Sequence, residues 1–327
     1  MSDDSSNIAN PPLPNSLPPD ESIVQPGVQL FEMPPPLAGI LTKTGRVSQG
    51  GFGDVYRGEW TQDDQAEPTQ VAIKQLRPIN SQHASNPAEA QERFERRIKR
   101  ETVIWRQARH DNILPFLGYQ LDGPSAVLVS PWCGYGCLSD YIRAHPELNR
   151  SEKLNLLHGA ALGLAYLHSR QPPIIHADIK PENVMISDDI RATLSDFGIS
   201  RFMVEVGMHT TLTTSGGNPG TAGYQAKETF EADFRPTNMS DVYAFGGLIL
   251  GTMSGKRPFH QFRAAAPIIF AIASNKHPIP ADHPGLPAID PLWNLLESCW
   301  DPVPQRRPSM ADIIVTLESE IANRADV

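Results

Sequence analysis

The chain has 327 residues, of which 40% are hydrophobic, 20% are charged and only three are cysteines. This length allows one large domain or two smaller ones, and the apolar fraction excludes disorder over the whole chain. Three cysteines cannot build a disulfide framework, which favours a reduced, intracellular protein. The net charge of −9 argues against a general nucleic-acid-binding protein.

Residues 1–37 differ in composition from the rest of the chain. They hold nine prolines and five acidic residues but no Lys or Arg, so this segment carries a charge of −5. Because proline cannot donate hydrogen bonds to a strand or a helix interior, we expect a disordered, Pro-rich acidic tail. The tail is either a docking ligand for a partner or a solvated segment without a dedicated partner.

Membrane association is not expected from the sequence. The acidic start, Met1-Ser2-Asp3-Asp4, does not fit a signal peptide, whose first residues are basic. No apolar run approaches the ~18 residues of a membrane span. We therefore expect a cytoplasmic protein, with the nucleus left open.

From about residue 38 the sequence pattern is typical of short strands. We expect strands at about 39–47, 52–60, 71–76, 114–120 and 126–131, from their β-branched and aromatic residues. A helical pattern over about 88–108 interrupts them.

After residue 136 the pattern is mainly helical. One apolar stripe at helical spacing consists of Leu154, Leu157, Ala161, Leu164 and Leu167. Residues 242–253 are apolar almost all round, which predicts a buried central helix. A last amphipathic helix is predicted behind the cap candidate Ser309, with the apolar face Ile313, Ile314, Leu317 and Ile321. A small β-rich part followed by a larger helical part indicates an α+β fold.

The first segment that suggests chemistry is a glycine cluster between two expected strands. It reads Ser48-Gln49-Gly50-Gly51-Phe52-Gly53-Asp54-Val55-Tyr56. Glycines allow backbone N–H groups to approach phosphates closely, but taken alone the cluster is explained better by an ordinary hairpin. About twenty residues later, the strand Val71-Ala72-Ile73-Lys74 ends in a cation, which by itself also fits a surface lysine.

The helix predicted over 88–108 supplies a partner for that lysine. Glu101 shares one helical face with Phe94, Ile98 and Trp105. A carboxylate on an apolar face is costly unless a cation meets it. Lys74 is the natural cation, although Arg97 and Arg100 are also within reach of Glu101.

The second half of the chain contains a denser cluster of polar residues. The run His176-Ala177-Asp178-Ile179-Lys180-Pro181-Glu182-Asn183 is followed by Ser195-Asp196-Phe197-Gly198. Two carboxylates and an amide provide oxygen ligands for Mg²⁺ and a base for a hydroxyl. Each could instead have a structural role, with Asp178 capping a turn and Asp196 beginning one. All of them in this order are improbable by chance.

In order and spacing, these segments resemble a eukaryotic protein kinase domain over about residues 38–325. Residues 220–228 resemble the end of an activation segment, and residues 240–246 resemble the start of the buried central helix. Cys299-Trp300 and Arg307-Pro308 resemble the C-terminal signature that tyrosine kinases share with the tyrosine-kinase-like group. The resemblance implies a two-lobed α+β fold. Its parts are an N-lobe at about 38–131, a hinge at about 131–136 and a C-lobe at about 137–325.

The resemblance also implies ATP, Mg²⁺ and a role for each matching residue. The catalytic residues would be Lys74, Glu101, Asp178 and Lys180. The nucleotide would be bound by Gly50, Gly51, Gly53, Val55, Ala72, Lys74, Ser130, Pro131, Cys133 and Met185. Mg²⁺ would be held by Asn183 and Asp196. Glu228 and Arg307 would form a buried structural pair. Cys133 and Cys137 have no second Cys/His pair at zinc spacing, so a hinge position explains them better than a metal site.

The sequence departs from the kinase pattern at Ser48, Ala177 and Lys227. None of these replaces a group that contacts metal or phosphate, so we expect an active enzyme. Lys180 and Thr221 fit kinases that phosphorylate Ser and Thr in protein substrates. The alternative is a pseudokinase scaffold that binds partners without efficient catalysis. Ala177 replaces an Arg that contacts a phosphorylated activation segment in other kinases, so we expect that such phosphorylation is not the principal on-switch.

Overall fold

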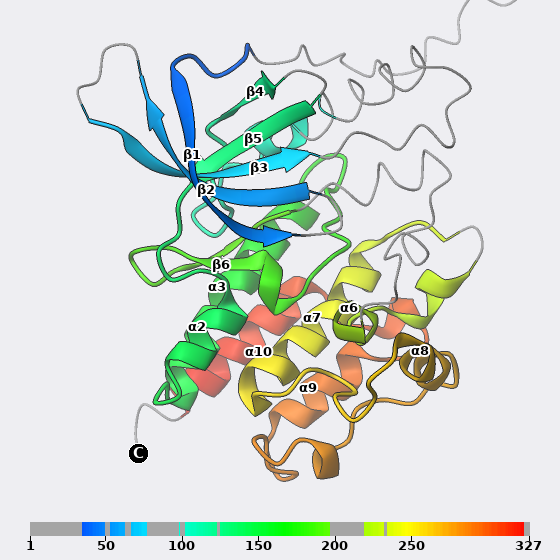
Figure 1. Ribbon diagram of the computed structural model, residues 1–327. Coiled ribbons are helices and arrows are strands. Elements are labelled where there is room, and N and C mark those ends of the chain that lie inside the picture. The colour runs from blue at the N-terminus through cyan, green and yellow to red at the C-terminus, as the bar shows by residue number, and fades with distance from the viewer. Residues whose placement is uncertain are drawn as a thin grey trace, which may run out of the picture. The chain divides into compact units, whose positions relative to one another are not determined.

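The computed structural model describes residues 35–49, 53–62, 67–76, 98, 102–122, 125–196, 219–231 and 234–323. The chain divides into a first unit, Met1–Glu32, and a second unit, Met33–Val327. The first unit, and with it most of the predicted tail, lies outside the described residues. The description below concerns the second unit, in which a sheet and a set of helices form a two-lobed α+β fold (Figure 1).

The N-lobe is built on one antiparallel sheet of five strands in the order β1-β2-β3-β5-β4. Its strands are β1 (Ile40–Gln49), β2 (Gly53–Thr61), β3 (Thr69–Leu76), β4 (Gly118–Asp122) and β5 (Ser125–Pro131). On one face of β3 and β5, Val71, Ile73, Val127 and Val129 form a small separate core. Residues on the opposite face of β5, such as Leu128, join the main hydrophobic core. Because β5 is buried on both faces, it carries apolar residues at consecutive positions instead of alternating apolar and polar ones.

The fourth strand begins later than the sequence predicts, at Gly118 instead of residue 114. Pro115 has no N–H to give to a strand ladder, and the N–H of Leu114 donates to the carbonyl of Leu194, at 2.9 Å. Residues 112–114 are thus attached to the C-lobe hairpin rather than to the N-lobe sheet.

The C-lobe consists mainly of helices. These are α2 (Leu138–Ala144), α3 (Arg150–His168), α6 (Pro219–Ala222), α7 (Asn238–Ser254), α8 (Ala265–Ala273), α9 (Leu292–Cys299) and α10 (Met310–Ala322). Short 3₁₀ turns lie at η2 (Pro181–Asn183), η3 (Lys227–Phe230), η4 (Pro280–Asp282) and η5 (Pro304–Arg306). A small antiparallel hairpin is formed by β6 (Val184–Ile186) and β7 (Ala192–Leu194).

The predicted central and last helices are confirmed. α7 is buried along almost its whole length. It begins with a reciprocal capping box between Thr237 and Ser240, and it ends at Gly255, whose φ of 71° suits glycine. α10 begins with the same kind of box between Ser309 and Asp312. The caps satisfy N–H groups that a helix start otherwise leaves unpaired.

The helix expected over 88–108 is described at Ile98 and residues 102–107, which are helical. Trp105 on this helix is buried, and its indole N–H donates to the carbonyl of Leu114 at 2.6 Å. Phe94 and Glu101 lie outside the described residues. Over the described ranges, no helix is long and apolar enough to cross a membrane.

Candidate active site

The loop that carries Asp178 is held in place by a buried carboxylate on α7. Asp241 is 1% exposed, and it accepts hydrogen bonds from the backbone N–H groups of His176 at 2.8 Å and Ala177 at 2.7 Å. Its third contact, with Nε2 of His168, is 2.9 Å long. Ala177 has a φ of 63°, which is unfavourable for a residue with a Cβ. The hydrogen bonds to Asp241 therefore offset local strain immediately before Asp178.

Asp178, Lys180 and Asn183 converge around one carboxylate. The ammonium of Lys180 lies 2.7 Å from Oδ2 of Asp178. The amide group of Asn183 donates to the same oxygen at 2.8 Å and to the Asp178 carbonyl at 2.7 Å. The 3₁₀ turn η2 fixes this spacing, since the N–H of Asn183 donates to the Lys180 carbonyl at 3.0 Å.

Lys74 and Asp196 form the second charged pair, although 122 positions separate them in the chain. Nζ of Lys74 lies 2.6 Å from Oδ1 of Asp196. Desolvation raises the pKa of Asp196, but the charge and hydrogen bond of Lys74, together with the charge of Lys180, outweigh it and hold the pKa below its ordinary value. Asp196 is therefore ionised at neutral pH.

Ser195 connects the charged group around Asp178 with the pair of Lys74 and Asp196. Its N–H and its hydroxyl donate to the carbonyl of Asn183 at 2.9 and 3.1 Å. Asp196 is thereby held next to Asn183, and the loop around Asp178 is connected to the pair made by Lys74. Five predicted functional side chains, those of Lys74, Asp178, Lys180, Asn183 and Asp196, thus belong to one network that spans 122 positions of the sequence.

Strand pairing brings together most of the residues expected at the adenine end of the site. In the ladder of β3 and β5, Ala72 is opposite Ser130. Pro131 ends β5, and Cys133 follows it with an exposed fraction of 6%. Burial, aided by the charge of Asp188, raises the pKa of the Cys133 thiol to about 11, so the thiol is neutral at physiological pH.

Cys137, which follows the hinge, lies beside the C-lobe hairpin. Met185 in β6 makes a β-bridge with Cys137, which places the strand beside the segment that follows the hinge. Within the described ranges there is no group of three or more His, Cys, Asp or Glu side chains able to hold a metal.

The glycine loop is described on both sides of residues 50–52, at the end of β1 and the start of β2. Gly53 begins β2, and a Cβ there would come within 2.3 Å of the carbonyl oxygen of Gln75. Close strand pairing therefore requires glycine at this position, whatever the loop binds. Val55, two residues further, pairs with Lys74 across the ladder. Gly50, Gly51 and Glu101 lie outside the described residues, so the predictions for them stay predictions.

The expected pair between Glu228 and Arg307 is confirmed. Two guanidinium nitrogens of Arg307 donate to the two carboxylate oxygens of Glu228, at 2.5 and 3.0 Å. Arg307 also donates to the carbonyl of Met239 at 2.8 Å, and its side chain is fully buried. Arg307 thereby connects η3, at the end of the predicted activation segment, to the start of α7. Lys227, in place of the usual proline, donates to the side chain of Asn275 at 2.9 Å.

No role was predicted for Asp241 or His168, although Asp241 lies in the segment 240–246 that resembles the start of the central helix. Asp241 stands in the first turn of α7, where an acidic residue is explained by the helix dipole alone. A signal was nevertheless present, because Asp241 lies at the start of the predicted buried helix and a buried carboxylate needs donors.

Comparisons with known proteins match most of the chain. The family model described as protein tyrosine and serine/threonine kinase matches residues 41–317. "LRR receptor-like serine/threonine-protein kinase FEI 2" of Arabidopsis thaliana is 31% identical over 84% of this chain and 45% of its own length. "Protein BRASSINOSTEROID INSENSITIVE 1" of the same plant is 34% identical over 65% of this chain and 16% of its own length. The chain therefore spans less than half the length of these relatives.

Proposed function

Because the chain belongs to the protein tyrosine and serine/threonine kinase family, we propose that it transfers the γ-phosphate of ATP to Ser and Thr hydroxyls of protein substrates. The observation that carries this proposal is the network of Lys74, Asp178, Asn183 and Asp196. It combines a cation for phosphates, oxygen ligands for a metal and a carboxylate for the acceptor hydroxyl, which are the groups that phosphoryl transfer needs.

Members of this family use ATP with a divalent metal, generally Mg²⁺. The donors available here fit that ion. The NH₂ group of Asn183 is turned toward Asp178, so its amide oxygen is left for a metal. Oδ1 of the ionised Asp196 is paired with Lys74, which leaves Oδ2 for the same ion. Mg²⁺ is commonly bound by one or two side-chain oxygens, with water and phosphate completing its coordination. When bound, the ion neutralises charge on the phosphate oxygens.

The nucleotide would lie between the sheet and the hairpin of β6 and β7. We infer that Lys74, oriented by Glu101, binds the α- and β-phosphates. The glycines at 50, 51 and 53 would cover them. Val55 and Ala72 would lie above the adenine and Met185 beneath it, with Ser130 at the back of the pocket.

The hinge offers one donor and one acceptor to the adenine. The N–H of Trp132 is used within the protein, since it donates to the carbonyl of Gln70 at 3.3 Å. The N–H of Cys133 makes no hydrogen bond within the described part of the chain. It is therefore available to the adenine ring, together with the carbonyl of Pro131. A proline at that position costs no hydrogen bond, because only its carbonyl is used.

At the acceptor end, Asp178 would orient the hydroxyl and accept its proton. Lys180, whose ammonium already lies beside this carboxylate, would counter the charge of the γ-phosphate during transfer. Lys180 and the names of the relatives support Ser and Thr as acceptors. Partner docking on the Pro-rich tail and a cytoplasmic location stay predictions.

The test is transfer of labelled phosphate from ATP to a generic protein substrate. Lys74→Met and Asp196→Asn should each reduce the rate by roughly 100-fold or more, or about 2.7 kcal/mol in activation free energy. Lys276→Met is the matched control, because Lys276 is exposed and its ammonium makes no hydrogen bond or ion pair within the described part. Near wild-type turnover in either site variant, with an unchanged melting temperature, would show that the site is assigned wrongly.

A further inference from the structure

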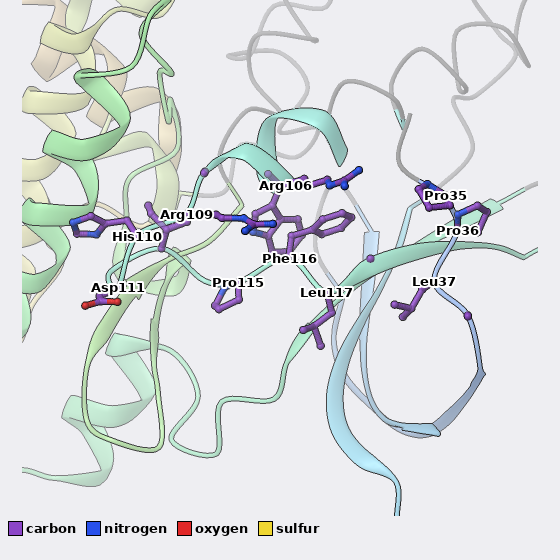
Figure 2. Close-up of a pocket in the computed structure, with 15 residues that line it drawn as sticks. Pro35, Pro36, Leu37, Arg106, Arg109, His110, Asp111, Pro115, Phe116 and Leu117 are labelled. Carbon is purple, nitrogen blue, oxygen red and sulfur yellow. The ribbon is translucent and has the colours of Figure 1, made fainter. Parts of the chain in front are cut away.

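A cavity of about 730 Å³ lies in the N-lobe, away from the residues proposed to bind ATP (Figure 2). One side of it is the segment 35–38, and the other is the end of the helix at 102–107 with the residues that follow to Gly118. We call it the N-lobe groove. None of the proposed catalytic, nucleotide or metal residues lines it, so the phosphoryl-transfer site does not explain it.

The floor of the N-lobe groove is apolar. Trp105 and Ile113 are buried beneath it, and Phe116, Leu117 and Leu37 are partly exposed. The rings of Trp105 and Phe116 pack with their centroids 5.1 Å apart. Figure 2 shows Leu37 on one side of the cavity and Phe116 on the other. A floor of this kind suits one large apolar side chain.

The rim of the groove is basic. Arg106 and Arg109 are both exposed, and neither guanidinium has an ion pair or hydrogen bond within the described part of the chain. The carboxylate of Asp111 lies 3.6 Å from Arg191, which partly neutralises it. The net charge of the chain is −9, but the charge at the mouth of this cavity is positive. The two arginines therefore create a local site for anions on an acidic protein.

The walls of the groove are fixed by hydrogen bonds rather than left loose. The N–H of Leu37 donates to the carbonyl of Tyr119 at 2.7 Å, and the side chain of Gln120 donates to the carbonyl of Leu37 at 2.9 Å. On the other side, the N–H of Arg109 donates to the hydroxyl of Tyr166 at 3.0 Å. A ligand would therefore bind to a preformed surface, at a low cost in ordering the backbone.

We propose that the N-lobe groove docks a short acidic segment of a partner protein. One large apolar side chain of that segment fills the floor, and neighbouring carboxylates bind Arg106 and Arg109. Charge complementarity selects this occupant. A second copy of this chain packed through a two-fold axis would bring the same arginines against each other, with only Asp111 to compensate. An uncharged apolar segment would leave both guanidinium groups unused.

The probe is a fluorescein-labelled peptide with one Phe flanked on each side by two Glu, titrated with the full chain by fluorescence anisotropy. Binding is expected with a Kd on the order of 10 μM. Replacing the Glu by Gln, or the Phe by Gly, should weaken it by about tenfold or more. The double variant Arg106→Glu, Arg109→Glu should weaken it to the same extent. The double variant Arg263→Glu, Arg306→Glu, at two exposed arginines away from the groove, is the control matched in charge and should leave affinity unchanged.

Three results would overturn the proposal. The first is no binding of the Phe and Glu peptide below ~1 mM to a chain that melts normally. The second is equal weakening by the control double variant Arg263→Glu, Arg306→Glu, which would reduce the effect to net charge. The third is a dimer in sedimentation that the double variant dissociates, which would assign the N-lobe groove to a second copy.

Discussion

Replacing Asp241 by Asn should damage both stability and turnover, because one carboxylate serves three donors. In the native protein, Oδ2 accepts from His168 and His176, and Oδ1 accepts from Ala177. An Asn side chain offers one acceptor oxygen, so its NH₂ group must face a backbone N–H that has no other partner. A buried unsatisfied donor costs about 1–3 kcal/mol, and the lost hydrogen bonds were charge-assisted. We therefore expect Asp241→Asn to lower the free energy of unfolding by about 3 kcal/mol.

This loss translates into a measurable shift in melting temperature. With an unfolding entropy of ~2.1 cal/mol/K per residue, about 3 kcal/mol lowers the melting temperature of a domain of this size by about 5 °C. Turnover should fall by about tenfold or more, since Ala177 is then free to leave its strained φ and Asp178 moves with it. The KM for ATP should change little, because Lys74 is untouched.

The assay combines thermal melting with initial rates of phosphate transfer. Asp111→Asn is the matched control, since that carboxylate is 88% exposed and its replacement should leave both readouts unchanged. If Asp241→Asn melted within about 1 °C of the native protein and kept its turnover, the hydrogen bonds to Asp241 would not be what holds the loop.

Further predictions concern the adenine pocket, pH and regulation. Ser130→Met should weaken ATP-site inhibitors that reach behind the hinge while ATP affinity changes little; equal inhibition of both forms would show that Ser130 does not line the pocket. Burial, together with the neighbouring charge of His260, lowers the pKa of His283 to about 4. Below the unfolded-state pKa of about 6.5, the unfolded chain binds a proton that the folded protein does not, so stability falls as the pH decreases from 6.5 to 4. His283→Gln should therefore reduce the decline of melting temperature between pH 6.5 and 4. At pH 5.5 the imidazole of His283 accounts for a loss of about 1.4 kcal/mol in the free energy of unfolding. Parallel curves of melting temperature against pH for the variant and the native protein would contradict the lowered pKa of His283. Phosphatase treatment that leaves the activation segment bare by mass spectrometry should leave the initial rate nearly unchanged, because Ala177 cannot contact a phosphate; a drop of roughly 100-fold, or about 2.7 kcal/mol, would reveal a phosphate-dependent switch.

Local patterns in the sequence predict much of the fold. The apolar run 242–253 and the cap Ser309 predict α7 and α10, because burial and capping depend on residues close in the chain. The predicted start of β4 was wrong because the observed start depends on a contact with a distant part of the chain. The run from Leu114 reads as a strand, but its N–H pairs with Leu194, 80 residues later.

The chemistry of the site is partly readable from the sequence and partly not. The types and order of Asp178, Asn183 and Asp196 indicate phosphoryl transfer, but sequence alone does not tell which cation meets which carboxylate. Glu101 was the expected partner of Lys74, and in the described residues the ammonium lies against Asp196. The support from Asp241 depends on α7 meeting the catalytic loop, which is a tertiary contact that no local pattern encodes.

The identity of the labelled acceptor tests the central proposal most directly. The measurement is phosphoamino-acid analysis of a peptide array labelled by the native chain and, in parallel, by Asp178→Asn. The melting temperatures of both proteins are measured, to show that the variant is folded. We predict label on Ser and Thr with little on Tyr, and a rate lower by roughly 100-fold or more in the variant. Dominant phosphotyrosine, or equal labelling by the variant, would contradict the account.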